Sequence, residues 1–277
     1  MAALQENVHI IPLGHEYDRA VTPFKKHSVD RVYLLSITKN TGKYEEVMIS
    51  RQLHFTNKVI EFFKSKNTEV ISREVQLFDL LEVMKQISAI IKAEQAKGHK
   101  VHINMSACGR KTSIGAALAG MANRADVYYV SAETYSLDYD SFKEHGLSIC
   151  EEGETFRFEN FEFDLPNVVC QKILVKLYQE NRGVLTTKLR EFLHNEGTEG
   201  FELNVASIPK ATKVIEKVDG KIINKRDEVI AQSIKLEKKY LGPLETSGYI
   251  RRERSGKNNI IFITESGKYV ACITGMV

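Results

Sequence analysis

The chain has 277 residues, of which 43% are apolar and 27% charged, and its formal net charge at pH 7 is +3. This length fits two domains better than one, and this composition excludes a globally disordered chain. No apolar run is long enough to span a bilayer, and no basic segment followed by a long apolar run opens the sequence, so we expect neither a membrane segment nor a signal peptide.

The charge is divided unevenly along the chain. Residues 166–277 carry 19 Lys and Arg against 13 Asp and Glu, whereas residues 1–165 carry 20 against 23. A basic C-terminal part predicts a polyanionic partner for that part. The four cysteines are scattered, and no pair has metal-ligand or redox-motif spacing, so we expect reduced thiols, no bound metal and a cytoplasmic location.

The first half alternates apolar, strand-like runs with helical segments. The strand-like runs are 8–13, 31–37, 68–75, 100–105 and 126–132, and the helical segments are 18–27, 52–66, 77–97 and a small-residue segment after Gly109. Near-continuous apolar strands with helices between them predict a parallel sheet covered on both faces. We therefore predict a doubly wound, Rossmann-like α/β domain over residues 1–150.

The stretch 101–122 is the most informative part of this domain. An apolar strand leads into the small-residue turn 106–109, and Arg110 and Lys111 stand where the next helix begins. Backbone N–H groups at a helix start, with two cations beside them, form a site for an anion such as a phosphate. Cations are electrostatically misplaced at a helix N-terminus, and a bound anion would resolve that conflict. The alternative is a solvated helix start after a turn that serves packing alone.

A second loop of interest follows the first strand and contains Gly14, His15, Glu16 and Asp18. Ligands of open α/β sheets bind beyond the carboxyl ends of the strands. The first and fourth strands lie near the centre of a doubly wound sheet, which would allow the two loops to share one crevice. The alternatives are that Asp18 is the N-cap of the first helix, that Glu16 is a solvated loop residue, and that Arg19 pairs with either carboxylate.

The pattern changes after residue 150. Residues 151–165 are acidic and alternate with phenylalanines, which predicts a hairpin linker that turns at Glu159 and Asn160. From 166 onward we predict helices near 167–177, 186–194 and 226–240, strands at 249–254 and 259–264, and a last helix at 265–272. Three helices and a basic hairpin predict a winged helix-turn-helix domain over 166–277, with its third helix in the DNA major groove. Residues 196–224 show no pattern and are either a disordered insert or an additional dimer contact.

The predicted DNA-binding residues lie on the third helix and the hairpin. They are Lys235, Lys238, Lys239, Arg251, Arg252, Arg254 and Lys257. Four cations within seven residues of a hairpin favour contact with phosphates, although charges on an edge hairpin also serve to prevent aggregation. The sequence contains no GxxxxGK[ST], GxGxxG, HExxH or CxxC motif, which disfavours an ATPase, a dehydrogenase or a zinc enzyme.

With these parts in place, the sequence resembles the archaeal transcription regulators that join a CARF (CRISPR-associated Rossmann fold) domain to a winged helix. The resemblance is carried by residues 8–21, 29–35, 102–122 and 241–269. It implies a homodimer that binds double-stranded DNA and senses a cyclic oligoadenylate, in particular cyclic tetra-adenylate, across its two-fold axis. The implied ligand site comprises Gly14, His15, Glu16, Asp18, Asn104, Ser106, Ala107, Cys108, Gly109, Arg110, Lys111 and Thr112.

Two further hypotheses stay open. The same site could cleave its ring ligand without a metal or other cofactor, with Lys111, Ser106 and His15 as the available groups. Alternatively, the protein is a DNA-binding dimer whose N-terminal domain is purely structural.

Overall fold

The structure, a computed structural model, describes residues 5–39, 42–160, 163–217, 219–256 and 258–277. It divides into two compact units, residues 1–163 with 272–275 and residues 164–271 with 276–277. The first unit contains β1 (Asn7–Pro12), α1 (Tyr17–Val21), the 3-10 turn η1 (Thr22–Phe24), β2 (Arg31–Ser36), α2 (Glu46–Ser65), β3 (Glu69–Glu74), α3 (Leu80–Gln95), β4 (Lys100–Asn104), α4 (Arg110–Ala122), β5 (Asp126–Val130), β6 (Thr134–Tyr135), α5 (Tyr139–His145), β7 (Ser148–Ile149) and β8 (Thr155–Phe158).

The main sheet of the first unit has the strand order β3-β2-β1-β4-β5-β8. The first five strands run parallel, and β8 pairs antiparallel with β5. The predicted Rossmann-like domain is confirmed, with a mostly parallel sheet. The chain moves outward from β1 through β2 to β3 and then returns to place β4 on the other side of β1. The loops after β1 and β4 therefore flank the point where the strand order reverses, which is where such sheets bind ligands.

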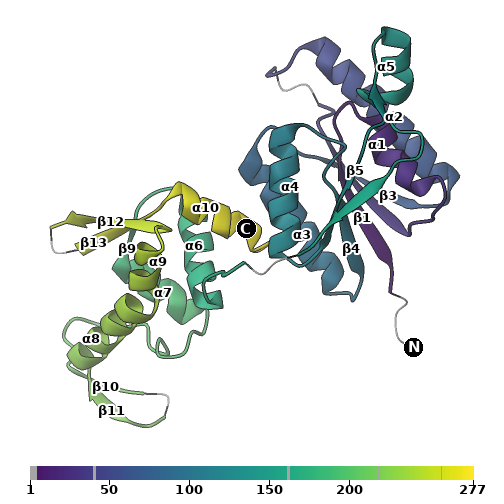
Figure 1. Cartoon of the computed structure of the whole chain (residues 1–277). Helices are drawn as coiled ribbons and strands as arrows, with labels where there is room; N and C mark the ends of the chain where they lie inside the picture. Colours follow the sequence, from purple (N-terminus) through teal and green to yellow (C-terminus); the bar gives the residue numbers. More distant parts are fainter. Residues whose placement is uncertain (1–4, 40–41, 161–162, 218, 257) are drawn as a thin grey trace. The chain divides into compact units, whose positions relative to one another are not determined.

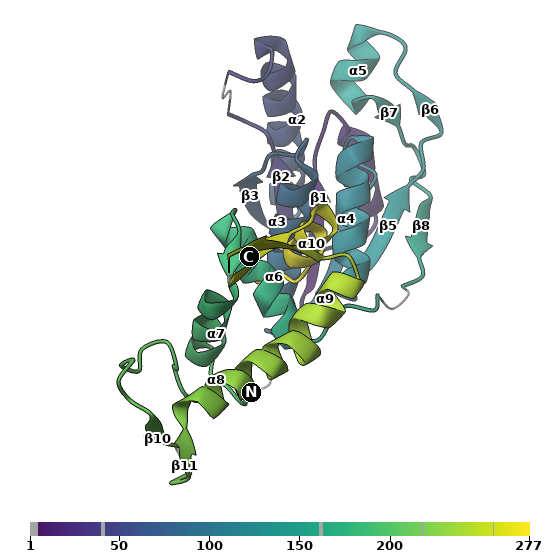
Figure 2. The ribbon, with the colours of Figure 1, turned by 90° about the vertical axis from the view of Figure 1, so that its left-hand side faces the viewer.

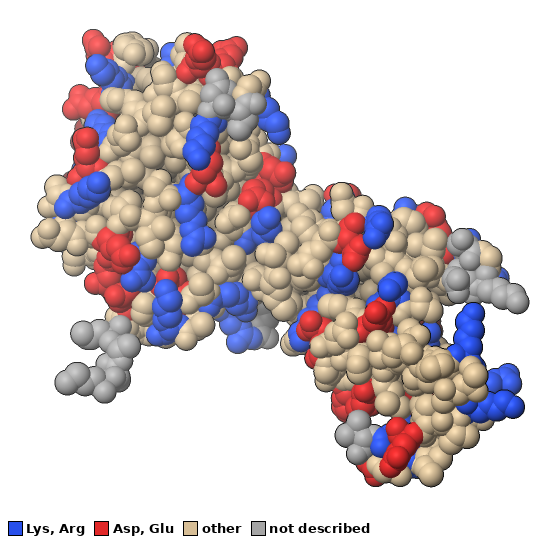
Figure 3. Space-filling view, turned by 180° about the vertical axis from the view of Figure 1, so that it is seen from behind, with Lys and Arg blue, Asp and Glu red and all other residues tan. Residues whose placement is uncertain are grey.

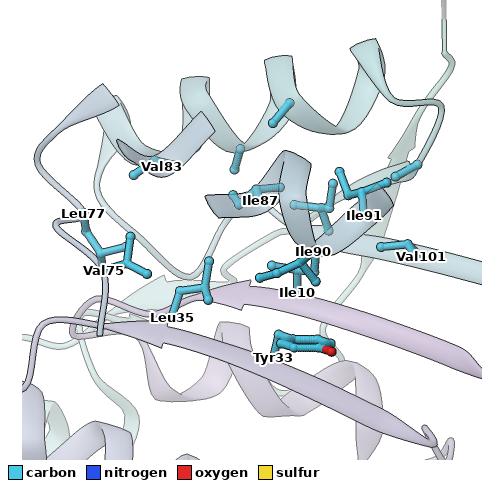
Figure 4. Packing of buried hydrophobic residues seen from close by; sticks show 14 of the residues in the cluster. Ile10, Tyr33, Leu35, Val75, Leu77, Val83, Ile87, Ile90, Ile91 and Val101 are labelled. Carbon is cyan, nitrogen blue, oxygen red and sulfur yellow. The ribbon is translucent and has the colours of Figure 1, made fainter. Parts of the chain in front are cut away.

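Helices cover both faces of this sheet (Figure 1). α3 and α4 pack on one face, and α1 and α2 pack on the other. Figure 4 shows Ile87 and Ile90 of α3 lying over Ile10 and Leu35 of the central strands, and all four side chains are fully buried. Strand residues alternate between the two faces, so the apolar runs recognised in the sequence supply both cores.

The small residues of α4 let that helix approach the sheet closely. A Cβ atom placed on Gly120 would lie 2.5 Å from the Ile103 Cδ1 atom of β4 and 2.5 Å from the Val127 Cγ2 atom of β5. Such distances are well inside van der Waals contact, so helix and sheet would have to separate or repack to admit a methyl group.

We therefore expect Gly120→Ala to destabilise the first unit by about 1–3 kcal/mol, because overpacking outweighs the gain of roughly 1 kcal/mol in helix propensity. Urea denaturation followed by circular dichroism measures this change. Lys111→Ala is the matched control, since Lys111 is exposed on the same helix and its loss should change stability by less than about 0.5 kcal/mol. A stabilised Gly120→Ala protein would contradict the close approach.

Two elements of the first unit differ from the sequence expectation. The predicted hairpin in 151–165 is wrong for Thr155–Phe158, which instead forms the β8 edge strand of the main sheet, while residues 161 and 162 lie outside the described residues. The alternation of acidic residues and phenylalanines that suggested a local hairpin is thus the alternation of an edge strand. The first helix is also shorter than predicted, since α1 ends at Val21 and Pro23 lies in the following 3-10 turn.

The second unit has the expected winged-helix order. It contains α6 (Val168–Glu180), β9 (Val184–Leu185), α7 (Thr186–Asn195), β10 (Val214–Glu216), β11 (Ile222–Asn224), α8 (Lys225–Lys235), the π-helical turn η2 (Leu236–Leu241), α9 (Gly242–Thr246), β12 (Ile250–Ser255), β13 (Asn258–Ile263) and α10 (Glu265–Ile273). β9, β13 and β12 form one small antiparallel sheet. The unpatterned insert contains a hairpin of its own, β10–β11.

The predicted third helix continues past Tyr240. Figure 2 shows α8, η2 and α9 as one continuous helix, with the π turn in its middle. Pro243 lacks an N–H and its ring crowds the carbonyl four residues earlier, so a regular α-turn is disfavoured there and the wider π turn accommodates it.

None of the helices in the described ranges is long and apolar enough to cross a membrane. No disulfide joins the four cysteines, of which Cys150, Cys170 and Cys272 are buried and Cys108 is half-buried.

Candidate functional site

The loops after β1 and β4 touch each other directly. The Gly14 N–H donates a hydrogen bond to the Ala107 carbonyl oxygen at 2.7 Å, and a Cβ atom on Gly14 would lie 3.5 Å from the Cys108 Cα atom. The strand order places the two loops side by side at the carboxyl ends of β1 and β4. The two loops are therefore close enough to form the shared crevice that the sequence predicts.

Glu16 and Asp18 are buried and hold the chain segment around β7 in place. The Glu16 carboxylate accepts hydrogen bonds from the Ser148 N–H at 3.1 Å and the Ser148 hydroxyl at 3.0 Å. The Asp18 carboxylate accepts one from the Cys150 N–H at 3.0 Å and contacts His145 Nδ1 at 2.9 Å. Burial raises the pKa of Glu16. Both carboxylates therefore have internal partners, and the ligand contact that the resemblance implies for them stays a prediction.

The alternative assigned to Asp18 is wrong. Glu16 occupies the N-cap position of α1, without a side-chain hydrogen bond, and Asp18 lies inside the first turn. The suggested pairing of Glu16 with Arg19 does occur, at 3.9 Å.

Arg19 places a buried positive charge beneath the turn that follows β4. Its Nη1 atom donates to the Ser106 carbonyl oxygen at 3.3 Å, and its guanidinium lies over the Tyr129 ring at 5.2 Å. Its Nε atom is buried and has no hydrogen-bond partner among the described residues. A single long contact with Glu16 balances this charge incompletely, so the turn above it carries a positive potential.

Three polar residues of the predicted ligand site are committed to the fold. Asn104 is fully buried and donates to the Arg19 carbonyl oxygen at 2.8 Å. The Ser106 hydroxyl donates to the Asn104 side-chain oxygen at 2.6 Å and accepts the Val130 N–H at 3.1 Å. The Thr112 hydroxyl donates to the Leu77 carbonyl oxygen at 2.6 Å. The Ser106 hydroxyl thus has two internal partners, and its part in ring cleavage stays a hypothesis.

Gly109, Arg110 and Lys111 are the predicted site residues that lie exposed at the start of α4. Gly109 is the N-cap and offers no side-chain hydrogen bond, and the first turn contains no acidic residue. Neither cation forms an ion pair with the residues that the structure describes. The first N–H groups of α4 and two free cations therefore face solvent together, which is the arrangement expected of an anion site. Beside them, Ala107 is buried, and burial raises the pKa of the Cys108 thiol to about 12.

His15 lies half-buried in the loop after β1. Its Nε2 atom is 3.3 Å from the Met48 carbonyl oxygen, so Nε2 carries the proton and donates. Burial is the main cause that lowers its pKa below the ordinary value of a histidine, and the Arg51 charge adds to the effect. His15 is thus a neutral ring at pH 7, positioned to pack beside a ligand rather than to attract its charge.

The second unit divides the predicted DNA-binding residues into two groups. Arg252 is only 19% exposed and is held by Glu237 at 2.6 Å and Glu245 at 2.8 Å. Strand alternation causes this, because Arg252 lies opposite the buried Ile261 and faces inward. Arg252 therefore joins the wing to the long helix, and its expected contact with DNA is replaced by an intramolecular role.

The other group is exposed. Lys238, Lys239, Arg251 and Arg254 are open to solvent, and Arg251 lies 4.3 Å over the Phe262 ring while also contacting Glu253. Lys235 is half-buried beside Glu199, at 4.0 Å. Lys257 lies outside the described residues. In Figure 3, Lys and Arg side chains project from the edge of this unit near its grey atoms.

The structure adds cations that the sequence analysis missed. Lys210, Lys213 and Lys221 are exposed in or beside the β10–β11 hairpin, and Arg226 is exposed in the first turn of α8. The hairpin adjoins that turn, because the Lys225 N–H donates to the Lys213 carbonyl oxygen at 2.8 Å. Lysines recur every three or four residues from 210 to 225, and this spacing could have indicated a basic surface. It was not used because the segment has no apolar periodicity from which to predict a helix or strand.

Comparisons with known proteins divide the chain in the same way. Residues 7–135 match the family model described as HFX_2341_N-like, N-terminal, and residues 169–275 match the DUF6293 C-terminal winged helix domain. These models cover the two halves that carried the resemblance, and they confirm this two-part organisation. No curated protein matches the chain.

Three solved structures are similar to the chain, at low identity and low TM-score. Can2 from Sulfobacillus thermosulfidooxidans, in complex with cyclic tetra-adenylate, is 14% identical with a TM-score of 0.37, and the match covers 96% of this chain and 63% of that one. Enterococcus italicus Csm6, bound to cyclic hexa-2'-fluoro-hexa-dAMP, is 11% identical with a TM-score of 0.40, over 71% and 52%.

A third similar structure is protein VC1899 from Vibrio cholerae, at 12% identity and a TM-score of 0.38, covering 96% of this chain and 64% of that one. The chain thus spans less than two thirds of each of these three proteins. Identities and TM-scores this low establish no shared ligand or activity.

Proposed function

Because the chain joins an HFX_2341_N-like N-terminal domain to a DUF6293 C-terminal winged helix domain, we propose that it is a ligand-responsive, DNA-binding transcription regulator. The observation that carries this proposal is the exposed, uncapped start of α4 with Arg110 and Lys111, at the point where the strand order reverses. An anion bound at this helix start would be able to regulate DNA binding by the winged helix of the same chain.

The proposed effector is a cyclic oligoadenylate, with cyclic tetra-adenylate as the first choice. The sequence resemblance suggests this class of ligand. The start of α4, with Arg110 and Lys111, supports it because these groups suit phosphates, and the half-buried His15 ring lies in the neighbouring loop. Regulation requires that the ligand bind two arrangements of the protein with different affinity, since equal affinity would shift nothing.

A homodimer would complete this site. The segment 134–149 exposes Tyr135, Leu137, Tyr139 and Leu147, and Leu137 is 95% exposed. The segment is anchored to the first loop, because the Leu147 N–H donates to the His15 carbonyl oxygen at 2.8 Å. An apolar surface next to the crevice suits a second copy, which would bring a second Arg110 and Lys111 and so one cation for each phosphate of cyclic tetra-adenylate.

We expect Leu137→Asp to convert the dimer to a monomer and to weaken the binding of cyclic tetra-adenylate at least tenfold, because a buried charge opposes apolar association. Light scattering after size-exclusion chromatography gives the mass, and calorimetry gives the affinity. Phe156→Asp is the control, since Phe156 is 59% exposed on the edge strand β8. A dimeric Leu137→Asp protein would rule out this contact surface.

The two arginines of the wing should separate DNA binding from folding. Arg254→Gln should weaken DNA binding about three- to tenfold and reduce the salt dependence of log K by about one, with unchanged stability, because an exposed phosphate contact is lost. Arg252→Gln should instead destabilise the second unit by about 1 kcal/mol, because the partly buried Arg252 loses its contacts with Glu237 and Glu245. Fluorescence anisotropy over a salt series and thermal denaturation distinguish the two, and the reverse pattern would contradict the assignment.

Fluorescence anisotropy with a labelled fragment of the protein's own promoter tests the proposed function as a whole. We expect cyclic tetra-adenylate to change DNA affinity by fivefold or more and to give a measurable binding heat. DNA binding without any binding heat would leave a purely structural N-terminal domain and would refute the sensing role. Ligand binding without any DNA affinity would refute the regulator.

A further inference from the structure

The first unit contains a cavity that the proposed function does not use. It has a volume of about 520 Å³ and lies on the amino-terminal halves of β1, β4 and β5, beside β8. Its walls include the chain segments 22–28 and 151–153. None of its lining residues belongs to the crevice between the loops after β1 and β4. Cavities of this size accommodate a small organic ligand.

The cavity exists because one part of the sheet lacks a covering helix. α1 and α2 pack on this face over β1 and β2, and their core includes Val32, Leu34, Phe55 and Val59. After β5 the chain turns into the β6–α5–β7 segment and then returns as the edge strand β8, so no helix of the doubly wound kind follows β5 on this face. His102 of β4 and Arg157 of β8 therefore line the cavity without a helix over them.

Aromatic and imidazole rings form the floor of the cavity. The register of β1 and β4 places His9 opposite His102, and their rings stack with centroids 4.6 Å apart at an interplanar angle of 17°. Phe24 meets the His9 ring edge-on at 4.8 Å. The Tyr128 hydroxyl is 3.1 Å from His9 Nδ1. A ligand ring can therefore stack on the flat faces of these side chains and form hydrogen bonds with their nitrogen and hydroxyl groups.

Both imidazoles keep an unused nitrogen. Burial lowers the pKa of His9 to about 3 and also lowers the pKa of His102, so both rings are neutral at pH 7. His102 Nδ1 lies 3.2 Å from the Asp126 carboxylate, on the side of the ring away from Nε2. Neither Nε2 atom has a hydrogen-bond partner among the residues that the structure describes. Unpaired polar atoms on a cavity floor are suited to a heteroaromatic ligand.

The rim of the cavity carries charges of both signs. Arg157 is exposed on β8, directly opposite Tyr128, and forms no ion pair with the described residues. Lys25 is likewise unpaired on the rim. Lys26 is balanced by Glu152 at 3.5 Å, and Glu151 and Asp126 are the other carboxylates of the lining. The cavity is thus balanced in charge as a whole, and Arg157 is the exposed guanidinium at which an anionic group would be held.

We propose that this cavity binds a phosphorylated heteroaromatic compound of the size of a mononucleotide, with its ring on His9 and His102 and its phosphate at Arg157. The two ends of the ligand meet different chemistry: neutral imidazole edges recognise the ring, and a guanidinium recognises the phosphate. The site is separate from the crevice that contains Arg110, so it provides the regulator with a second, independent ligand.

Adenosine 5′-monophosphate is the probe for this site, with adenosine and inorganic phosphate as partial ligands. Calorimetry on the full chain should show the monophosphate binding at least tenfold more tightly than either partial ligand. The ring signals of His9 and His102 in a ¹H–¹³C NMR spectrum should shift with it, assigned with the help of the His102→Gln variant. Saturation with cyclic tetra-adenylate should leave this binding unchanged, because the two sites share no residue.

Arg157→Gln should weaken binding of the monophosphate at least tenfold. Arg73→Gln should not, because Arg73 is an exposed arginine on β3, the opposite edge of the same sheet. The proposal is overturned if the monophosphate gives no heat and moves neither histidine signal, if Arg157→Gln binds it as well as the wild type, or if cyclic tetra-adenylate displaces it. None of these results bears on whether cyclic tetra-adenylate changes the DNA affinity, so the proposed function is tested separately.

Discussion

Replacing Arg110 and Lys111 together by glutamine should weaken the binding of cyclic tetra-adenylate by at least 100-fold. Each cation that contacts a phosphate contributes a charge-assisted hydrogen bond, and a symmetric dimer would lose four of them at once. A 100-fold loss corresponds to roughly 2.7 kcal/mol, which is modest for four such contacts. Calorimetry measures the affinity directly.

The fold should tolerate this change. Both side chains are exposed, and neither has an ion-pair partner among the described residues, so no buried partner is left unpaired. The variant should therefore keep its ligand-free DNA affinity and lose only the response to the ligand. The matched control is Lys238→Gln with Lys239→Gln, a second pair of adjacent exposed cations, which should lose DNA affinity and retain ligand binding. Unchanged ligand affinity in the Arg110 and Lys111 variant would remove the crevice as the binding site.

Glu94→Gln should destabilise the first unit by about 3 kcal/mol at pH 7. The Glu94 side chain is fully buried and accepts hydrogen bonds from Arg31 at 2.8 Å, Lys97 at 2.9 Å and the Tyr33 hydroxyl at 2.7 Å, with His99 Nδ1 at 2.8 Å. Removing one partner of such a buried network leaves the others unpaired, which costs several times more than losing a surface ion pair.

The loss should depend on pH in a defined direction. Burial alone would raise the pKa of Glu94, but the hydrogen bonds from Tyr33, Lys97 and His99 and the Arg31 charge lower it to about 2. A carboxylate with a lowered folded-state pKa contributes stability above its unfolded pKa, near 4.5, and this contribution fades as the pH falls toward 2. The difference between wild type and Glu94→Gln should therefore shrink between pH 5 and pH 2.

Urea denaturation across this pH range checks both statements. Glu82→Gln is the control, since Glu82 lies on the same helix and forms a partly exposed pair with Lys85 at 3.0 Å, so its loss should cost well under 1 kcal/mol. A constant difference between wild type and Glu94→Gln from pH 5 to pH 2 would contradict the lowered pKa. Glu6, Glu94 and His99 also converge as metal ligands do, but Arg31 contacts both carboxylates and supplies the cation itself.

Periodicity alone was sufficient for most of the fold. The apolar runs that became β1 to β5, and the helical spacing of α3 and α6, depend on local side-chain patterns that a buried strand or an amphipathic helix requires. The start of α4 was also predictable, because its small turn, two cations and glycine-rich helix are adjacent in the sequence. The edge strand β8 was not, since its partner β5 lies about 30 residues earlier and pairing is a long-range event.

The roles of individual polar residues were decided by tertiary structure. The sequence by itself determined that the chain joins a Rossmann-like domain to a winged helix and that Arg110 and Lys111 begin an exposed helix. Only the fold could show that Glu16 accepts a hydrogen bond from Ser148 and that Arg252 pairs with Glu237. Such contacts depend on which distant parts of the chain pack against a residue. For the same reason, His9 and His102 became neighbours over a cavity only when β1 and β4 paired.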